Sequence, residues 1–269
     1  MTTVAPTPVS RAERSAPVLR LSFGRVLRSE WIKFASLRST WWSLAIAAVL
    51  TIGIALMIAS ASRGFGDGYT AVSAIVAPTQ FTMLVAGILG AIAITGEYST
   101  GMIRSTLTAE PRRGAVLLAK AVVITVVMAV STALMLAIAL IVTAPVFGAD
   151  GVDWSDPAYS TVPLLFTVLS MVAFSLIGLA AGFLIRNGAG AIAATVGVLF
   201  VLPIVTSMFA MAGDGWRWVL DAAAHLPMMA AQTVTTPGTA DLTQGTIDLL
   251  AWPLVGLIAA WLLLRVRDA

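Results

Sequence analysis

The sequence predicts an all-α membrane protein with six transmembrane helices and both termini in the cytoplasm. Of its 269 residues, 59% are hydrophobic and only 11% are charged, whereas in soluble domains about a quarter are charged. A chain so poor in charge cannot cover a water-facing surface, and the lipid bilayer is the solvent that suits it. Charged residues also divide the sequence into apolar blocks, and Lys and Arg gather on alternate sides of these blocks.

The N-terminal region contains two predicted elements. Residues 1–19 hold prolines and mixed polar side chains and are expected to form a disordered cytoplasmic tail. Residues 20–40 predict an amphipathic interfacial helix, because apolar and polar side chains recur on opposite faces at helical spacing. The apolar face holds Phe23, Val26, Leu27, Trp31 and Phe34, and the polar face holds Arg25, Arg28, Ser29, Lys33 and Ser36. This helix can lie in the inner interface or act as a simple topogenic anchor, and the two roles are compatible.

Six apolar blocks follow within residues 41–269, the predicted transmembrane domain. A helix needs about 20 apolar residues to cross the bilayer, and only the block between Asp248 and Arg265 is shorter than this. Helices are expected because backbone groups in lipid must bond within their own segment. The predicted spans are 41–62, 71–95, 114–143, 161–185, 189–211 and 248–265.

The placement of Lys and Arg predicts the orientation of these spans. With the N-terminus inside, only Arg63 and Arg217 among the basic residues fall in outer segments. The outer segments instead collect acids: Asp67, Asp150, Asp153, Asp156, Asp214, Asp221, Asp241 and Asp248. The net charge of +3 therefore reflects membrane topology and not nucleic-acid binding.

The composition excludes several kinds of chemistry. With no Cys and one His, His225, the chain cannot form Cys-based or multi-histidine metal sites. Neither of its lysines, Lys33 and Lys120, precedes a Ser or Thr as a phosphate-binding P-loop requires. We therefore expect no enzyme activity and no cofactor in this chain. His225 is interpreted as an interfacial polar residue.

Charged side chains are not expected inside the apolar blocks, which argues against a proton- or sodium-driven pump. Lys120, near the inner end of the third span, is expected to snorkel to the interface. Glu97, at the inner end of the second span, is expected to pair with one of three arginines: Arg104, Arg112 or Arg113.

Milder features within the spans concern packing or a transport path. Thr79 and Gln80 lie in the outer half of the second span, where Gln80 either faces a pathway or bonds to a neighbouring helix. Pro163 and Pro203 are expected to kink the fourth and fifth spans. The small-residue pattern at 178–182 predicts that two helices approach closely there.

Two segments outside the spans are distinctive. In the inner loop 96–113, Ser99 or Thr100 is expected to cap a short helix that Pro111 ends. Such a rigid polar turn suits docking to a partner, although an ordinary basic loop would also explain it. The outer segment 212–247 is too apolar for a solvated loop, and its Trp residues suit the membrane interface. It predicts one or two short helices in or dipping into the outer leaflet.

Two sequence motifs precede the first span and follow the second. Segment 29–42 reads SEWIKFASLRSTWW, and segment 96–104 reads GEYSTGMIR, with PRR at 111–113. They resemble the patterns E-W-x-K-x-x-S-L-R-S-T-W-W and G-E-Y-x-x-G-x-I-R … P-R-R of permeases from actinobacterial type-2 ABC exporters, the drug/polysaccharide exporter superfamily. The six spans and the long outer segment agree with that family, so the resemblance covers nearly the whole chain.

The resemblance implies a role for each polar segment. The amphipathic helix would be a connecting helix along the inner leaflet, with the residues Glu30, Trp31, Lys33 and Arg38. The inner loop would be a coupling helix that fits a separate ATPase, with the residues Glu97, Tyr98, Ser99, Thr100, Met102, Ile103 and Arg104. The outer segment would form short re-entrant helices of an extracellular lid, with the residues Trp216, Trp218, Leu226 and Pro227. The candidates for the pathway are Thr79, Gln80 and Pro203.

The implied function is that of a membrane-spanning exporter permease in the plasma membrane. It would move an amphipathic or apolar compound outward, such as a drug, antibiotic, peptide or lipid-like molecule. Its expected partners are an ABC ATPase that binds ATP and Mg, a second permease copy or related permease, and membrane lipid, but no nucleic acid. One alternative is a non-transporting membrane subunit, such as a sensor or immunity component, of an ATPase complex. Another is a membrane enzyme on lipids, for which the inner face offers only the isolated Glu97.

Overall fold

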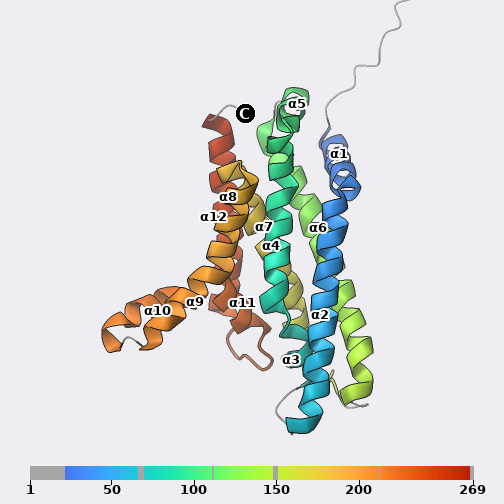
Figure 1. Cartoon of the computed structure of the whole chain (residues 1–269), viewed down its shortest axis with the longest axis vertical. Coiled ribbons are helices and arrows are strands. Elements are labelled where there is room, and N and C mark those ends of the chain that lie inside the picture. Colours follow the sequence, from blue (N-terminus) through green and yellow to red (C-terminus); the bar gives the residue numbers. More distant parts are fainter. Residues whose placement is uncertain (1–21, 66–69, 111, 148–150, 212, 267–269) are drawn as a thin grey trace, which may run out of the picture.

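The computed structural model describes residues 22–65, 70–110, 112–147, 151–211 and 213–266. All regular structure in these ranges is helical (Figure 1). The predicted tail 1–19 and Pro111 lie outside them. The α-helices are α1 Phe23–Ser36, α2 Arg38–Phe65, α3 Ala71–Val76, α4 Thr79–Ser99, α5 Met102–Ala109, α6 Arg113–Phe147, α7 Thr161–Ile185, α8 Gly188–Val196, α9 Leu202–Ser207, α10 Arg217–Ala224, α11 Pro227–Thr235 and α12 Thr243–Val266.

Within the described ranges, six helical segments are long and apolar enough to cross a membrane, which confirms the predicted all-α membrane protein with six spans. They are Arg38–Ser62, Ala71–Ser99, Arg113–Phe147, Thr161–Ile185, Gly188–Met211 and Thr243–Val266. The last begins earlier than the predicted 248–265, because the helix continues through the polar turn at Thr243. Asp248 therefore lies inside α12 and not ahead of it.

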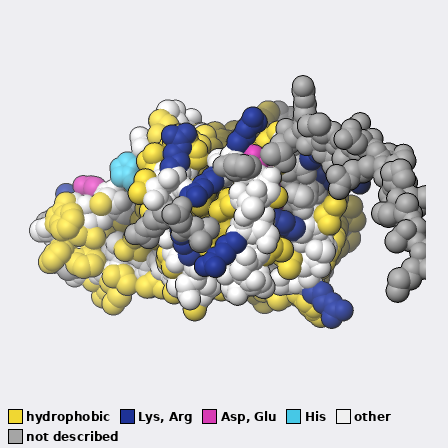
Figure 2. Space-filling view, turned by 90° about the horizontal axis from the view of Figure 1, so that it is seen from above, with side chains coloured by type: hydrophobic (Ala, Val, Ile, Leu, Met, Phe, Trp, Pro, Cys, Tyr) yellow, Lys and Arg dark blue, Asp and Glu magenta, His cyan; other side chains and the backbone are white. Residues whose placement is uncertain are grey.

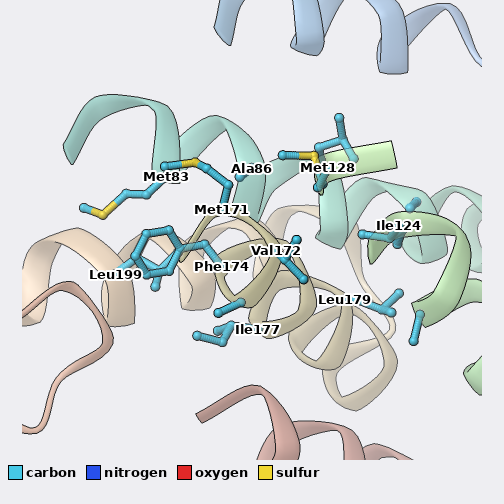
Figure 3. Packing of buried hydrophobic residues seen from close by; sticks show 14 of the residues in the cluster. Met83, Ala86, Ile124, Met128, Met171, Val172, Phe174, Ile177, Leu179 and Leu199 are labelled. Carbon is cyan, nitrogen blue, oxygen red and sulfur yellow. The ribbon is translucent and has the colours of Figure 1, made fainter. Parts of the chain in front are cut away.

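The centre of the bundle is the contact between α4 and α7, which glycines make unusually close. A Cβ atom added to Gly90 would lie 1.8 Å from the Ser175 carbonyl oxygen, and one added to Gly178 would lie 1.9 Å from the Gly87 oxygen. The small-residue pattern at 178–182 thus allows two helices to approach closely, as predicted. Larger side chains fill the space around this contact, and Figure 3 shows Met83, Met128, Phe174 and Leu199 among them.

Two of the spans are interrupted. The second is broken between α3 and α4 at Ala77 and Pro78, and Pro78 takes the N-cap position of α4. In the fifth, a π-helical segment, Gly197–Val201, joins α8 to α9 just before Pro203. Since proline removes a backbone donor, an irregular turn beside it is expected. In Figure 1 the chain turns away from the bundle after this point.

The prediction for Pro163 was wrong. This residue lies in the first turn of α7, Thr161–Ile185, where a backbone N–H has no partner within the helix in any case. It therefore frees no carbonyl group in mid-span. Its own carbonyl accepts a hydrogen bond from the Thr167 hydroxyl at 2.8 Å.

The bundle has two distinct ends, which are named here after their helices. The α5 end carries α1, α5 and the last turn of α12, and the α11 end carries α3, α10 and α11 (Figure 1). The described N- and C-terminal ends of the chain therefore lie on the same side of the bundle. An even number of spans requires this arrangement.

Candidate functional site

The short helix α5, Met102–Ala109, projects from the α5 end of the bundle (Figure 1). It begins at Gly101, whose φ of 71° is in the left-handed region that glycine tolerates best. Ile103 is buried beneath it, whereas Met102 and Arg104 are exposed. The helix is thus fixed from below by one apolar side chain and presents a mixed apolar and basic surface outward.

The prediction that Ser99 or Thr100 caps this helix was wrong. The Ser99 and Thr100 hydroxyls donate to the Gly96 carbonyl oxygen at 3.0 and 2.8 Å, so they close the end of α4 instead. Gly101 stands at the N-cap and provides no side-chain bond. Both hydroxyl-bearing residues remain exposed beside α5 and belong to the same surface as Met102 and Arg104.

Behind α5 lies a compact cluster of four charged side chains, which we call the charge cluster: Glu30, Lys33, Glu97 and Lys120. Lys120 Nζ lies 2.5 Å from Glu30 Oε2 and 2.7 Å from Glu97 Oε1. Lys33 Nζ lies 2.8 Å from Glu30 Oε1 and 3.3 Å from Glu97 Oε1. Two carboxylates and two ammonium groups therefore cancel in charge, as burial in an apolar environment requires.

The charge cluster joins three helices that are not consecutive in the sequence: α1, α4 and α6. Glu30 and Lys33 are one turn apart on α1, Glu97 is in the last turn of α4, and Lys120 is about two turns inside α6. The side chains of Glu30, Glu97 and Lys120 are only 1–5% exposed, and that of Lys33 is 24% exposed. A fourth helix is connected by Lys33, which donates to the Thr106 hydroxyl of α5 at 3.0 Å.

Three predictions about these charges were wrong. Glu97 pairs with Lys33 and Lys120 and not with an arginine, and Arg113 donates instead to the Leu264 carbonyl oxygen at 2.7 Å. Lys120 does not snorkel, since its side chain is 5% exposed and paired. Charged groups are therefore buried at the end of the bundle, where local hydropathy indicated none. The physical reason is that opposite charges brought together by three helices offset the cost of burying each charge alone.

The predicted residues of the amphipathic helix divide into two sets. Val26, Glu30 and Phe34 form the buried row of α1, which packs against α6. Trp31 and Phe23, assigned to the apolar face, are 49% and 44% exposed, and Arg38 is also exposed at the start of α2. Sequence periodicity missed this arrangement because Lys33 was assigned to the polar face from its polarity and not from its partners, and Glu30 was assigned to neither face. The only signal of this arrangement in the sequence was the one-turn spacing of Glu30 and Lys33. The two other buried charges lie elsewhere in the chain.

The coupling-loop residues are likewise divided. Ser99, Thr100, Met102 and Arg104 are exposed, Tyr98 is half-buried, and Ile103 and Glu97 are buried. Arg186, which ends α7, lies over the Tyr98 ring with its guanidinium carbon 5.6 Å from the ring centre. Only the exposed members can contact another protein directly, whereas Glu97 acts within the charge cluster.

A cavity of about 200 Å³ lies near the α11 end, at the break between α3 and α4. Thr79, Gln80 and Gln232 line it together with apolar side chains such as Met83 and Phe174. No charged residue is among the lining residues. Gln80 is exposed and makes no side-chain hydrogen bond within the described residues, so bonding to a neighbouring helix does not account for it here. Pro203 is buried in the fifth span and does not line this cavity.

The segment that precedes the last span forms two short helices, α10 and α11, where one or two were predicted. Leu226 and Pro227 are buried where α10 turns into α11, whereas Trp216 and Trp218 are 44% and 65% exposed on the arm that leaves the bundle. His225, predicted to be an interfacial polar residue, is exposed, and its Nδ1 lies 2.8 Å from Asp248 Oδ2. This pair fastens the end of α10 to α12.

Charge is distributed unequally between the two ends. Seen from the α5 end, Figure 2 shows Lys and Arg in several patches across the bundle, with few acidic groups among them. Asp153 and Asp241 lie in loops towards the other end. Hydrogen bonds from the Ser155 hydroxyl and backbone N–H lower the pKa of Asp153 and so favour its ionised form.

Six apolar helices with one basic end define a multi-pass membrane protein. Residues 26–204, from α1 to α9, match the family model described as ABC-2 family transporter protein, and the chain belongs to this family of type-2 ABC permeases. The matched region includes α5 and the whole charge cluster. Members of this family are membrane components that in general work with an ABC ATPase. A search of curated proteins found no match.

Proposed function

We propose that this chain is the permease subunit of an ABC exporter in the plasma membrane. It moves an amphipathic or apolar compound outward with energy from ATP that a separate subunit, carrying ATP and Mg, hydrolyses. The observation that carries the proposal is α5, a short exposed helix connected to the spans behind it by the buried Ile103 and by the Lys33–Thr106 bond. A helix that must transmit a push needs such contacts with the spans.

The orientation supports this assignment. The basic α5 end faces the cytoplasm, as the excess of Lys and Arg there favours. In that orientation α5 is accessible to a cytoplasmic ATPase, and Met102 and Arg104 offer it one apolar and one cationic contact. The apolar arm with Trp216 and Trp218 then lies at the outer interface, where tryptophan is enriched in membrane proteins.

The proposed mechanism is a rigid-body movement. Closure of two ATPase subunits on ATP pushes the α5 helices of two permease copies together, and the attached spans tilt to open a path outward. The α4–α7 contact is too close for these helices to slide past each other, so they move as one unit. The uncharged cavity at Gln80 suits neutral or amphipathic cargo better than a small ion.

Substitution of the exposed α5 surface tests the proposal. Arg104→Glu combined with Met102→Ala is expected to reduce co-purification of the ATPase and ATP-driven export of fluorescent amphipathic dyes at least tenfold. The variant should still insert and unfold like the unmodified chain, because both side chains are exposed. Glu97 is unsuitable for this test, since its substitution would disturb the charge cluster. If the variant retains both ATPase and export, α5 is not the docking helix.

The same assay separates a transporter from a non-transporting subunit. A sensor or immunity component would retain the ATPase in a complex but show no ATP-dependent movement of any dye in proteoliposomes. Substrate-stimulated ATP hydrolysis is expected for an exporter. Its absence with every compound tested, in a complex that otherwise hydrolyses ATP, would favour the non-transporting role.

A further inference from the structure

Lys33 differs from the other three members of the charge cluster. It is the most exposed of the four, and among them only Lys33 forms a side-chain hydrogen bond to α5. Its ammonium lies within 2.8–3.3 Å of Glu30, Glu97 and Thr106, so a single flexible side chain connects α1, α4 and α5. Glu30 and Lys120 would still bind each other if Lys33 moved.

The two oxygen atoms of the Glu97 carboxylate differ in their hydrogen-bond partners. Its Oε1 accepts from both Lys120 and Lys33, whereas its Oε2 is buried and has no hydrogen-bond partner among the described residues. A buried acceptor without a donor is unfavourable, and structures generally avoid it. Oε2 can therefore accept a hydrogen bond from a donor that moves towards it. Lys33 Nζ is 3.3 Å from the other oxygen of the same carboxylate.

We propose that Lys33 is the positioning residue that links the location of α5 to the spans. Its ammonium has two positions: one shared with the Thr106 hydroxyl, as observed, and one on Glu97 Oε2. Movement of α5 away from α1 breaks the bond to Thr106, and Lys33 then donates to Glu97 Oε2. This inference rests on the proposed function, in which α5 receives the movement of the ATPase.

Such an exchange needs little free energy. One hydrogen bond is lost and another is formed, and the two positions lie on neighbouring atoms of one buried cluster. A small push on α5 is therefore enough to shift the equilibrium between them. The triad of Glu30, Lys120 and Glu97 holds α1, α4 and α6 together in both states, so the spans respond as one body.

The first test uses the purified permease alone. Thr106→Val removes the hydroxyl that Lys33 contacts and leaves all four charges in place. Thr106→Val loses the bond from Lys33 and also the bond from the Thr106 hydroxyl to the Met102 carbonyl oxygen within α5. Hydrogen–deuterium exchange of the α5 amides is expected to rise about fivefold more than in Thr108→Val, which loses only a bond of the second kind, while exchange in α7 stays unchanged. Thr108→Val is the matched control, since its hydroxyl bonds only to the Arg104 carbonyl oxygen within α5. Equal exchange in the two variants would overturn the link.

A structure of the Thr106→Val variant tests the second position. Lys33 Nζ is expected within hydrogen-bond distance of Glu97 Oε2. A side chain that points to solvent instead would refute the exchange. Lys33→Met should raise α5 exchange as Thr106→Val does. If Lys33→Met fails to fold, Thr106→Val by itself still tests the two positions of Lys33.

The second test uses the complex with its ATPase. Thr106→Val is expected to retain the ATPase but to export about fivefold less dye per ATP hydrolysed, whereas Thr108→Val should behave normally. If the unmodified chain binds no ATPase, the proposed function is refuted. The hydrogen–deuterium exchange test of the Lys33–Thr106 contact does not depend on that result. A valine variant with faster α5 exchange but full coupling would refute the role of Lys33 in transmission.

Discussion

The ammonium of Lys120 lies 2.7 Å from Glu97 Oε1, although α5 and the start of α6 separate these two residues in the chain. The pair fixes the end of α4 against α6 directly beside the short exposed helix. Since Lys120 also binds Glu30, it joins α1 to the same point. Lys120 therefore connects α1, α4 and α6 at the α5 end.

Removal of the Lys120 charge should destabilise the protein strongly. Lys120→Met leaves Glu30 and Glu97 buried with only Lys33 to compensate them, and breaking a buried pair costs about 3–5 kcal/mol. Unfolding followed in detergent by heat or denaturant measures the loss, and Lys120→Arg should recover part of it. Arg104→Met, an exposed cation at the same end, should change stability by less than about 0.5 kcal/mol. Equal effects of the two methionine variants would contradict the geometry of the cluster.

Glycine at the α4–α7 contact should tolerate no side chain. Gly178→Ala places a Cβ 1.9 Å from the Gly87 carbonyl oxygen, and backbone on both sides cannot yield as a side chain can. Overpacking of this kind costs about 1–3 kcal/mol, which the same unfolding measurements can detect. Gly53→Ala is the matched control, since no atom lies within 4 Å of its added Cβ, and it should be neutral or stabilising. A tolerated alanine at 178 would mean that the two helices are farther apart.

Cysteine labelling should reveal the orientation, because the chain has no Cys of its own. Thr108→Cys places an exposed thiol on α5, and Ala240→Cys places one in the loop before α12. With the α5 end in the cytoplasm, a membrane-impermeant maleimide should label position 240 in intact cells. Position 108 should react only after the membrane is permeabilised. The reverse pattern would invert the topology and remove the proposed ATPase contact.

The cavity at the break of the second span should matter for cargo and not for assembly. Ala77→Phe fills space beside Gln80, where about 200 Å³ is available. ATP-dependent export of amphipathic dyes is expected to fall several-fold, while the ATPase stays bound, because α5 is at the opposite end. Ala61→Phe, on an exposed part of α2, provides a control of equal size. Normal export by the Ala77 variant would show that the cargo does not pass this cavity.

Local properties of the sequence correctly predicted the number of spans and the short helix between the second and the third. Hydrophobicity is summed over neighbouring residues, so the six apolar segments can be recognised without knowledge of their contacts. The break before α4 was not predicted, although Pro78 was visible. The role of Pro163 was misjudged because a proline is harmless in a first helical turn and disruptive later.

The sequence by itself determined that this chain is a helical membrane protein with six spans and a polar turn between the second and third spans. Only the tertiary structure decided which charges are buried. Glu30, Glu97 and Lys120 stand far apart in the chain, and each alone would be too costly to bury. Their burial becomes favourable only when three helices bring opposite charges within hydrogen-bond distance. That is a property of packing, which local composition does not contain.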